Sequence, residues 1–159
     1  LSSVVTGSLP TATAAGVIYD STESVVKYAD GTNWVPLNKT IYTSATTSTL
    51  ATSIVFIDVL SFGALALLPG DWLITANFEL YASAGRGLTR WYDTTAVAAI
   101  ANSTRHHYCG GTTVDSMNTS MNMIKITLAV ASTITLQIST KVAATTFSVN
   151  NPTIFARRV

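Results

Sequence analysis

The densest group of chemically reactive side chains is the run Arg105-His106-His107-Tyr108-Cys109. Imidazole and thiolate groups bind zinc, and a zinc site takes three or four such ligands from the protein. On a strand, His107 and Cys109 share one face, and His106 and Tyr108 share the other. The whole chain has only two His and one Cys. We therefore predict no metal or cofactor here, a structural Cys109 packed inside, and His106 at a surface or subunit contact. The alternative is a metal shared across a threefold axis.

The acidic residues and the small residues do not form a catalytic pattern. No Ser lies in a Gly-x-Ser-x-Gly elbow, and no Gly-rich loop is built to hold a phosphate. Gly85-Arg86-Gly87 is predicted to be the tip of a hairpin. Five acidic residues fall in or beside predicted turns: Asp20, Glu23, Asp30, Asp71 and Asp93. The sequence predicts that this protein is not an enzyme and has no catalytic residues.

Four aromatic residues offer ring faces on which a sugar could stack: Trp34, Trp91, Tyr92 and Tyr108. Trp34 more simply anchors its own small module by packing. Trp91 and Tyr92 are neighbours on a predicted strand, so one faces the core and the other faces outward. An outward aromatic residue is therefore the candidate contact for a host surface glycan.

The elements that position these residues are strands, and the clearest is Asp71 to Ala82. Alternate residues of this segment are all apolar, and side chains two apart on a strand share a face. We predict that these alternate residues line a core: Trp72, Ile74, Ala76, Phe78 and Leu80. The segment Met121 to Val130 has the same character. Pro69-Gly70 marks the turn before the first of these strands.

A smaller module precedes these strands. Residues Leu1 to Ala15 are small and polar and are predicted to form an extended arm. A three-stranded meander should follow, with strands at Val17–Asp20, Ser24–Ala29 and Thr32–Val35. Asp30-Gly31 is its hairpin turn, because both residues tolerate unusual backbone angles. The meander is too small to be stable alone.

The rest of the chain is punctuated every eight to twelve residues by turn residues, and we find no amphipathic helix. This spacing is typical of a β-sandwich or barrel. The longer predicted segments are Thr40–Ser44, Ser53–Leu60, Leu88–Tyr92, Thr133–Thr140, Thr145–Val149 and Thr153–Arg157. Charged residues make up 11% of the chain and the net charge is +1. Such a surface attracts neither nucleic acid nor an acidic partner, and it favours coverage by copies of the same chain. No apolar run is long enough to predict a membrane helix.

Four short matches connect the meander to a known family: Tyr19-Asp20, Lys27-Tyr28, Asp30-Gly31-Thr32 and Trp34-Val35. In this order they resemble a module of structural proteins from tailed bacteriophages. Residues 39–159 resemble the trimeric jelly-roll heads of the tumour-necrosis-factor and complement-C1q type. That second resemblance is carried by Leu68-Pro69-Gly70-Asp71-Trp72 and by the closing strand Thr153 to Arg158.

The resemblances imply an all-β jelly-roll β-sandwich preceded by an extended arm and a small three-stranded meander. They also imply a structural protein of the virion surface, most simply a homotrimeric capsid decoration or cement protein. Residues 1–37 would attach to the major capsid protein or another virion protein through Tyr19, Tyr28 and Trp34, and residues 38–159 would form the head. The alternatives are a tail-fibre or receptor-binding head that recognises host glycan or protein, and a secreted C1q-like module. The absence of disulfides and the phage-like meander argue against the secreted module.

Overall fold

The chain divides into two compact units in the computed structural model. One is Leu1–Thr40 with Arg157–Val159, and the other is Ile41–Ala156. The structure describes residues 1–13, 16–37, 40–44, 49–59, 64–82, 85–109, 118–142 and 145–159. The sequence places the domain boundary between residues 37 and 38. In the structure the small unit runs on to Thr40, and the last three residues group with it instead of with the head.

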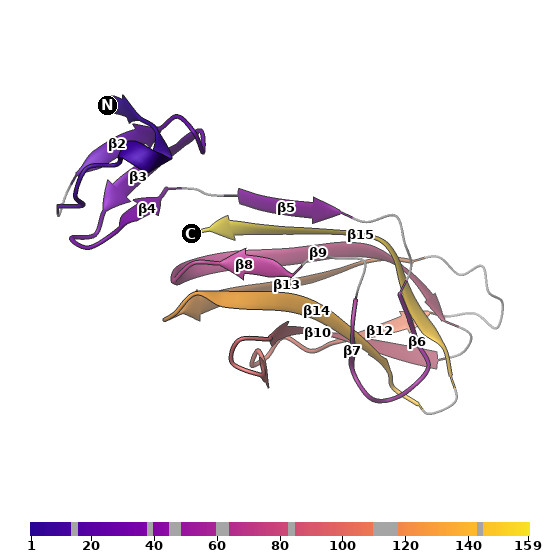
Figure 1. Cartoon of the computed structure of the whole chain (residues 1–159). Helices are drawn as coiled ribbons and strands as arrows, with labels where there is room; N and C mark the ends of the chain where they lie inside the picture. Colours follow the sequence, from indigo (N-terminus) through magenta and orange to yellow (C-terminus); the bar gives the residue numbers. More distant parts are fainter. Residues whose placement is uncertain are drawn as a thin grey trace. The chain divides into compact units, whose positions relative to one another are not determined.

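The small unit is a four-stranded sheet in the order β1-β2-β3-β4 (Figure 1). Its strands are β1 (Ser2–Val4), β2 (Val17–Asp20), β3 (Val25–Ala29) and β4 (Trp34–Pro36), and a short 3-10 turn covers Thr6–Ser8. Strands β2, β3 and β4 are the predicted antiparallel meander. Strand β1 adds to it in parallel, with Ser3 opposite Tyr19. The predicted extended arm therefore contributes a strand of its own, because the backbone of β1 pairs with β2.

The larger unit consists of two stacked sheets (Figure 1). The first has the order β13 (Asn118–Leu128), β9 (Gly70–Ala82), β15 (Phe147–Arg158) and β5 (Thr40–Ser44), and β6 (Thr49–Ala51) also pairs with β15. The second has the order β11 (Ala98–Ala99), β10 (Gly85–Asp93), β14 (Ser132–Thr140) and β7 (Ile57–Asp58). In the second sheet, β12 (Arg105–Cys109) also pairs with β10, and β8 (Leu65–Leu67) also pairs with β14.

The chain crosses repeatedly between these two sheets. Strands β9, β13 and β15 lie in the first sheet, whereas β10 to β12 and β14, which alternate with them along the chain, lie in the second. In a jelly roll, antiparallel strands that are distant in sequence pair with each other, and the connections between strands cross from one sheet to the other at both ends of the sandwich. The fold is thus the predicted all-β jelly-roll sandwich. In the part of the chain that the structure describes, no helix is long and apolar enough to cross a membrane.

The core lies between the inner faces of the sheets. The five alternating residues of β9, from Trp72 to Leu80, have exposed fractions of 0–2%. Their cross-strand neighbours on β13 continue the layer, with Ile124 opposite Ile74 and Ile126 opposite Trp72. The facing sheet contributes Ile134, Leu136 and Ile138 of β14. Trp91 of β10 lies in the same layer, and all four side chains are fully buried. Alternation on β9 thus places one whole side of the strand in the core.

Three predicted strands take a different form. In the described part of the predicted strand Ser53–Leu60, residues 53–59, only Ile57–Asp58 is a strand, and Ile54 and Val55 are exposed to solvent. At the C-terminus, two predicted strands are one strand, β15. Its buried residues fall on odd numbers up to Val149 and on even numbers from Pro152. An extra residue that changes this parity is a β-bulge, and Asn151 adopts a positive φ of 43° there.

The predicted hairpin tip at Gly85-Arg86-Gly87 is wrong, because all three residues lie within β10 and pair with β12. Gly87 is needed for packing instead of for a turn. A Cβ atom at this position would lie 2.0 Å from ring carbons of Phe147. The missing side chain therefore lets the Phe147 ring of the opposite sheet lie against the backbone of β10.

Candidate functional site

A buried ion pair holds the small unit together. Lys27 on β3 donates to the Asp20 carboxylate at 2.7 Å, and both side chains are almost fully buried. Asp20 also accepts hydrogen bonds from the Thr6 hydroxyl and from the backbone N–H groups of Thr22 and Glu23. The hydrogen bond from Lys27 is the main reason why the pKa of Asp20 lies well below its usual value. Asp20 thereby joins three segments: the arm, the turn after β2, and β3.

The Asp30-Gly31 turn is stabilised in a similar way. The Asp30 carboxylate accepts hydrogen bonds from the backbone N–H groups of Thr32 and Asn33, at 2.9 and 2.7 Å. These two bonds lower the pKa of Asp30. Gly31 supplies a φ of 100°, which side-chain-bearing residues rarely adopt. The residue pairs that carry the phage resemblance therefore have definite roles in forming this unit.

Of the three predicted attachment residues, Trp34 is engaged within its own unit. Its indole N–H donates to the Pro10 carbonyl at 2.7 Å. Its ring lies over Gly16, where a Cβ atom would come within 2.9 Å of it. Trp34 therefore ties the arm to β4. Tyr19 is partly buried in the central strand β2.

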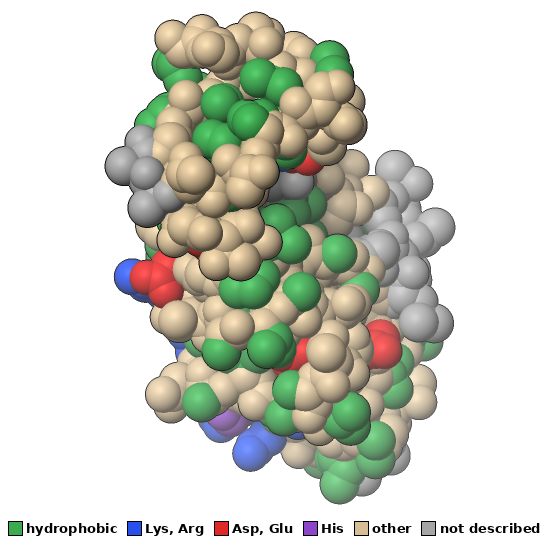
Figure 2. Space-filling model, turned by 60° about the vertical axis from the view of Figure 1, so that its left-hand side comes forward, with side chains coloured by type: hydrophobic (Ala, Val, Ile, Leu, Met, Phe, Trp, Pro, Cys, Tyr) green, Lys and Arg blue, Asp and Glu red, His purple; other side chains and the backbone are tan. Residues whose placement is uncertain are grey.

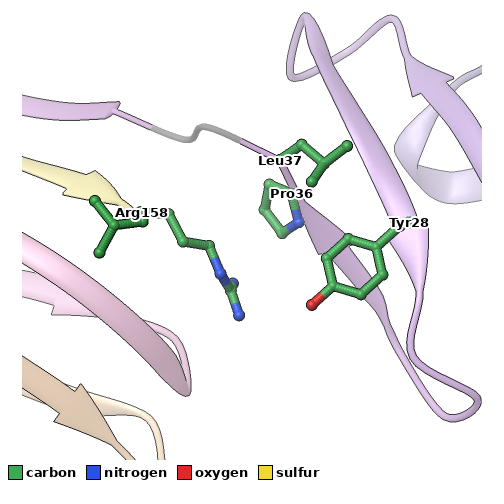
Figure 3. A pocket seen from close by; sticks show the side chains of 5 residues that line it. Tyr28, Pro36, Leu37 and Arg158 are labelled. Carbon is green, nitrogen blue, oxygen red and sulfur yellow. The ribbon is translucent and has the colours of Figure 1, made fainter.

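Tyr28, the third attachment candidate, borders a hollow in the surface of the small unit. The hollow has a volume of about 170 Å³ and is lined by Tyr28, Pro36, Leu37, Arg158 and Val159. Figure 3 shows the Tyr28 hydroxyl and the Arg158 guanidinium pointing toward each other across it. Among the predicted attachment residues, Tyr28 offers the most accessible ring, with an exposed fraction of 36%.

In the head, His107 belongs to a buried polar network. Its Nε2 atom lies 2.8 Å from the Thr89 hydroxyl, which also accepts a hydrogen bond from the Asn122 amide at 2.8 Å. The Asn122 amide also donates to the Ser103 carbonyl. The His107 ring packs edge-to-face on Phe78 and is stacked near Phe147. Thr89 and Asn122 are fully buried, so this polar network lies within the core of the head.

Burial lowers the pKa of His107 to about 4, and the positive charges of His106 and Arg105 act in the same direction. His107 is therefore neutral at physiological pH, as a core histidine should be. The described residues contain no group of three His, Cys, Asp or Glu that could hold a metal ion. The Cys109 side chain lies outside the described side chains, so its structural role stays a prediction.

The outer face of the same two strands carries an open groove of about 390 Å³, lined by Arg86, His106, His107 and Tyr108. Arg86 on β10 lies directly opposite Tyr108 on β12 in the ladder, and Leu88 lies opposite His106. Arg86, His106 and Tyr108 are all exposed. Sequence reasoning missed this group, because residues that are about twenty positions apart become neighbours only through strand pairing.

The aromatic residues considered for sugar binding differ in whether their side chains face the core or the outer surface. Trp91 is fully buried in the core, whereas its neighbour Tyr92 is only partly buried on the outer face. Tyr92 lies near Arg90, whose guanidinium carbon is 5.3 Å from the ring centroid. Tyr108, at 65% exposure, is thus the most accessible of the four aromatic candidates.

No protein-family model matches this chain, and no curated protein matches it. Solved structures do match in fold. Eiger TNF from S. frugiperda superposes with a TM-score of 0.56 at 10% identity, over 77% of this chain and 93% of that chain. A chain from the infectious bursal disease virus Gt strain gives a TM-score of 0.54 at 15% identity, over 95% of this chain and 42% of that chain. This chain therefore spans less than half of the viral chain. At these identities the likeness shows the jelly-roll fold alone.

Proposed function

We propose that this protein is a structural protein of a tailed-phage virion surface, and that it acts as a homotrimeric capsid decoration or cement protein. The observation that carries the proposal is the pairing of a phage-like small sheet, whose matching residues build its ion pair and turn, with a jelly-roll head. The proposal includes no enzymatic activity, no cofactor, no nucleic-acid partner and no membrane partner. Figure 2 shows a face on which charged side chains are few among hydrophobic and uncharged polar ones, as expected for a surface that copies of one protein cover.

The outer face of the β13-β9-β15-β5 sheet is our proposed contact between copies. It exposes Tyr42 on β5 and Met123 on β13, with exposed fractions of 65% and 46%. Two of its charges are paired, since the Lys125 ammonium lies 3.5 Å from the Asp71 carboxylate. Paired charges lose less electrostatic energy than single charges when another protein covers them, and the exposed Tyr42 and Met123 side chains supply apolar area for the contact.

The oligomeric state tests this contact. Changing Tyr42 to Asp should convert a trimer into monomers at micromolar concentration, because the new carboxylate would have to be buried without a partner. Sedimentation velocity measures the result. Val130→Asp is the control, since Val130 is 63% exposed in the turn that follows β13. A wild-type protein that sediments as a monomer would exclude the trimer.

The small unit is our proposed attachment surface. Tyr28 lies between Val17 and Val35 in the sheet register, so the three side chains share a face. Val17 is 49% exposed, and Leu37, which follows β4, is 43% exposed. Val17, Tyr28 and Leu37 thus expose apolar surface on a sheet of four short strands, whereas Val35 beside them is buried. Three such weak contacts, one from each subunit of a trimer, would reinforce one another on a symmetric lattice.

Attachment is tested with virus particles that lack this protein. Tyr28→Asp should reduce co-sedimentation with capsids by at least about tenfold, because it places a charge on the apolar surface of the small unit. It should leave the trimer intact. Tyr108→Asp, a matched change at an exposed tyrosine of the head, should not affect attachment. Capsid binding by Tyr28→Asp at the wild-type level would refute this attachment surface.

The same assay separates the second candidate function, a tail-fibre or receptor-binding head. A fibre should co-sediment with tails and not with capsids. The observation that favours this candidate is the open groove on β10 and β12, because its lining brings an arginine, two histidines and a tyrosine together on one surface, as a recognition site would.

A further inference from the structure

We propose that the groove on the outer face of β10 and β12 is a binding site for an acidic saccharide. The groove is lined by the Arg86, His106 and Tyr108 side chains and by His107. This inference goes beyond the structural role, because it does not depend on whether the protein is attached to a capsid, to a tail or to nothing.

The first argument is charge. In the part of the chain that the structure describes, no ion pair or side-chain hydrogen bond involves Arg86 or His106. Lys141 adds a further exposed cation nearby, since its backbone N–H donates to the Arg86 carbonyl at 2.8 Å. By contrast, Arg90 on the same outer face is already bonded to Gln137. Two exposed cations, Arg86 and Lys141, thus lie close together beside this groove with no acidic partner among the described residues. Figure 2 shows a histidine side chain beside Lys or Arg side chains at the surface.

The second argument is the aromatic ring. Tyr108 stands directly across from Arg86 on the neighbouring strand, where side chains of opposed residues are within contact distance. Its ring is 65% exposed, and no described residue is hydrogen-bonded to its hydroxyl. An exposed tyrosine face can stack on the apolar face of a pyranose ring, while its hydroxyl bonds to the sugar hydroxyls.

The two features together define the ligand class. A guanidinium binds a planar carboxylate through two parallel hydrogen bonds, and an ammonium ion cannot reproduce this geometry. A ring face next to it selects a carboxylate that is attached to a sugar over a free inorganic anion. His106, two residues before Tyr108 on the same face of β12, is placed to donate to a ring hydroxyl or to the carboxylate. A uronic-acid residue within a polysaccharide fits this arrangement.

Isothermal titration calorimetry with the full chain tests the site. The probes are an oligosaccharide that alternates glucuronic acid with N-acetylglucosamine, a neutral oligosaccharide of N-acetylglucosamine alone, and inorganic polyphosphate. The acidic oligosaccharide should bind at least about tenfold more tightly than either of the others, the affinity ratio that one charge-assisted hydrogen bond can supply.

Variants test separately the recognition of the carboxylate by Arg86 and the stacking of the sugar ring on Tyr108. Arg86→Gln should remove the preference for the acidic oligosaccharide, and Tyr108→Ala should weaken its binding by about tenfold. Tyr108→Phe keeps the ring and should retain most of the affinity. Lys125→Gln is the matched control, because Lys125 is an exposed cation on the other sheet. Both altered groove residues are exposed, so melting curves should be unchanged.

Equal binding of the neutral and acidic oligosaccharides would overturn the proposal, as would no binding at millimolar concentration. Polyphosphate binding as tight as that of the acidic oligosaccharide, and insensitive to Tyr108→Ala, would also overturn it. That result would show simple attraction of anions to a basic surface.

Discussion

Replacing Phe78 with Ala is expected to lower the free energy of unfolding by about 3–5 kcal/mol, the usual cost of removing a buried ring. Phe78 is 2% exposed on the inner face of β9, and its ring meets the His107 ring at a centroid distance of 5.4 Å. Its loss would leave a cavity and also remove one wall of the buried polar network. Urea denaturation at neutral pH measures the effect.

The matched control for Phe78 is Val130→Ala. Val130 is 63% exposed, and surface substitutions of this kind change stability by less than about 0.5 kcal/mol. The melting temperature should fall by about 6–20 °C for Phe78→Ala, given the usual 2–4 °C per kcal/mol for a chain of this size. A melting temperature within a degree of wild type would mean that Phe78 is not a core residue.

The second large effect is a loss of stability in mild acid that comes from His107. Burial holds its pKa at about 4 in the folded protein, against 6.5 for an ordinary histidine. Between these two values the unfolded chain binds a proton that the folded chain does not. The contribution of neutral His107 to the free energy of unfolding is therefore complete above pH 6.5, and it is progressively lost as the pH falls toward 4. Allowing for some solvent screening, the loss between pH 7.5 and 4.5 should be about 2 kcal/mol.

Urea midpoints of wild type and His107→Gln at these two pH values measure this contribution. Gln retains an amide that can hydrogen-bond to Thr89, but it cannot take up a proton, so the variant should lose about 2 kcal/mol less than wild type on acidification. His106→Gln, at the exposed neighbouring position, should behave as wild type does. The low pKa of Asp20 keeps its ion pair intact in this window, because stability from a carboxylate with a lowered pKa is lost only below its ordinary pKa of 3.8. An equal acid loss in His107→Gln and wild type would show that His107 is accessible to protons in the folded state.

Patterns within short segments were enough to predict much of the fold. The alternation from Trp72 to Leu80 predicts the buried face of β9, because burial on a strand repeats every second residue whatever the strand pairs with. The Asp30-Gly31 turn is equally local, since one carboxylate and one glycine stabilise it. The many short strands predict a sandwich, and the resemblance to jelly-roll heads points to its topology.

The candidate sites depend on contacts between distant segments, and these only the tertiary structure decided. Gly87 looks like a turn residue in the sequence, but the ring of Phe147, sixty positions later, requires it within a strand. The bulge at Asn151 joins two apparent strands into one, because both halves pair within one sheet. The groove exists because Arg86 and Tyr108 lie opposite each other in one register of β10 with β12. A shift of that register by one residue would turn β12 over and place His107 in solvent. Strand register is set by the packing of the whole core, so no local pattern of residue types could have specified it.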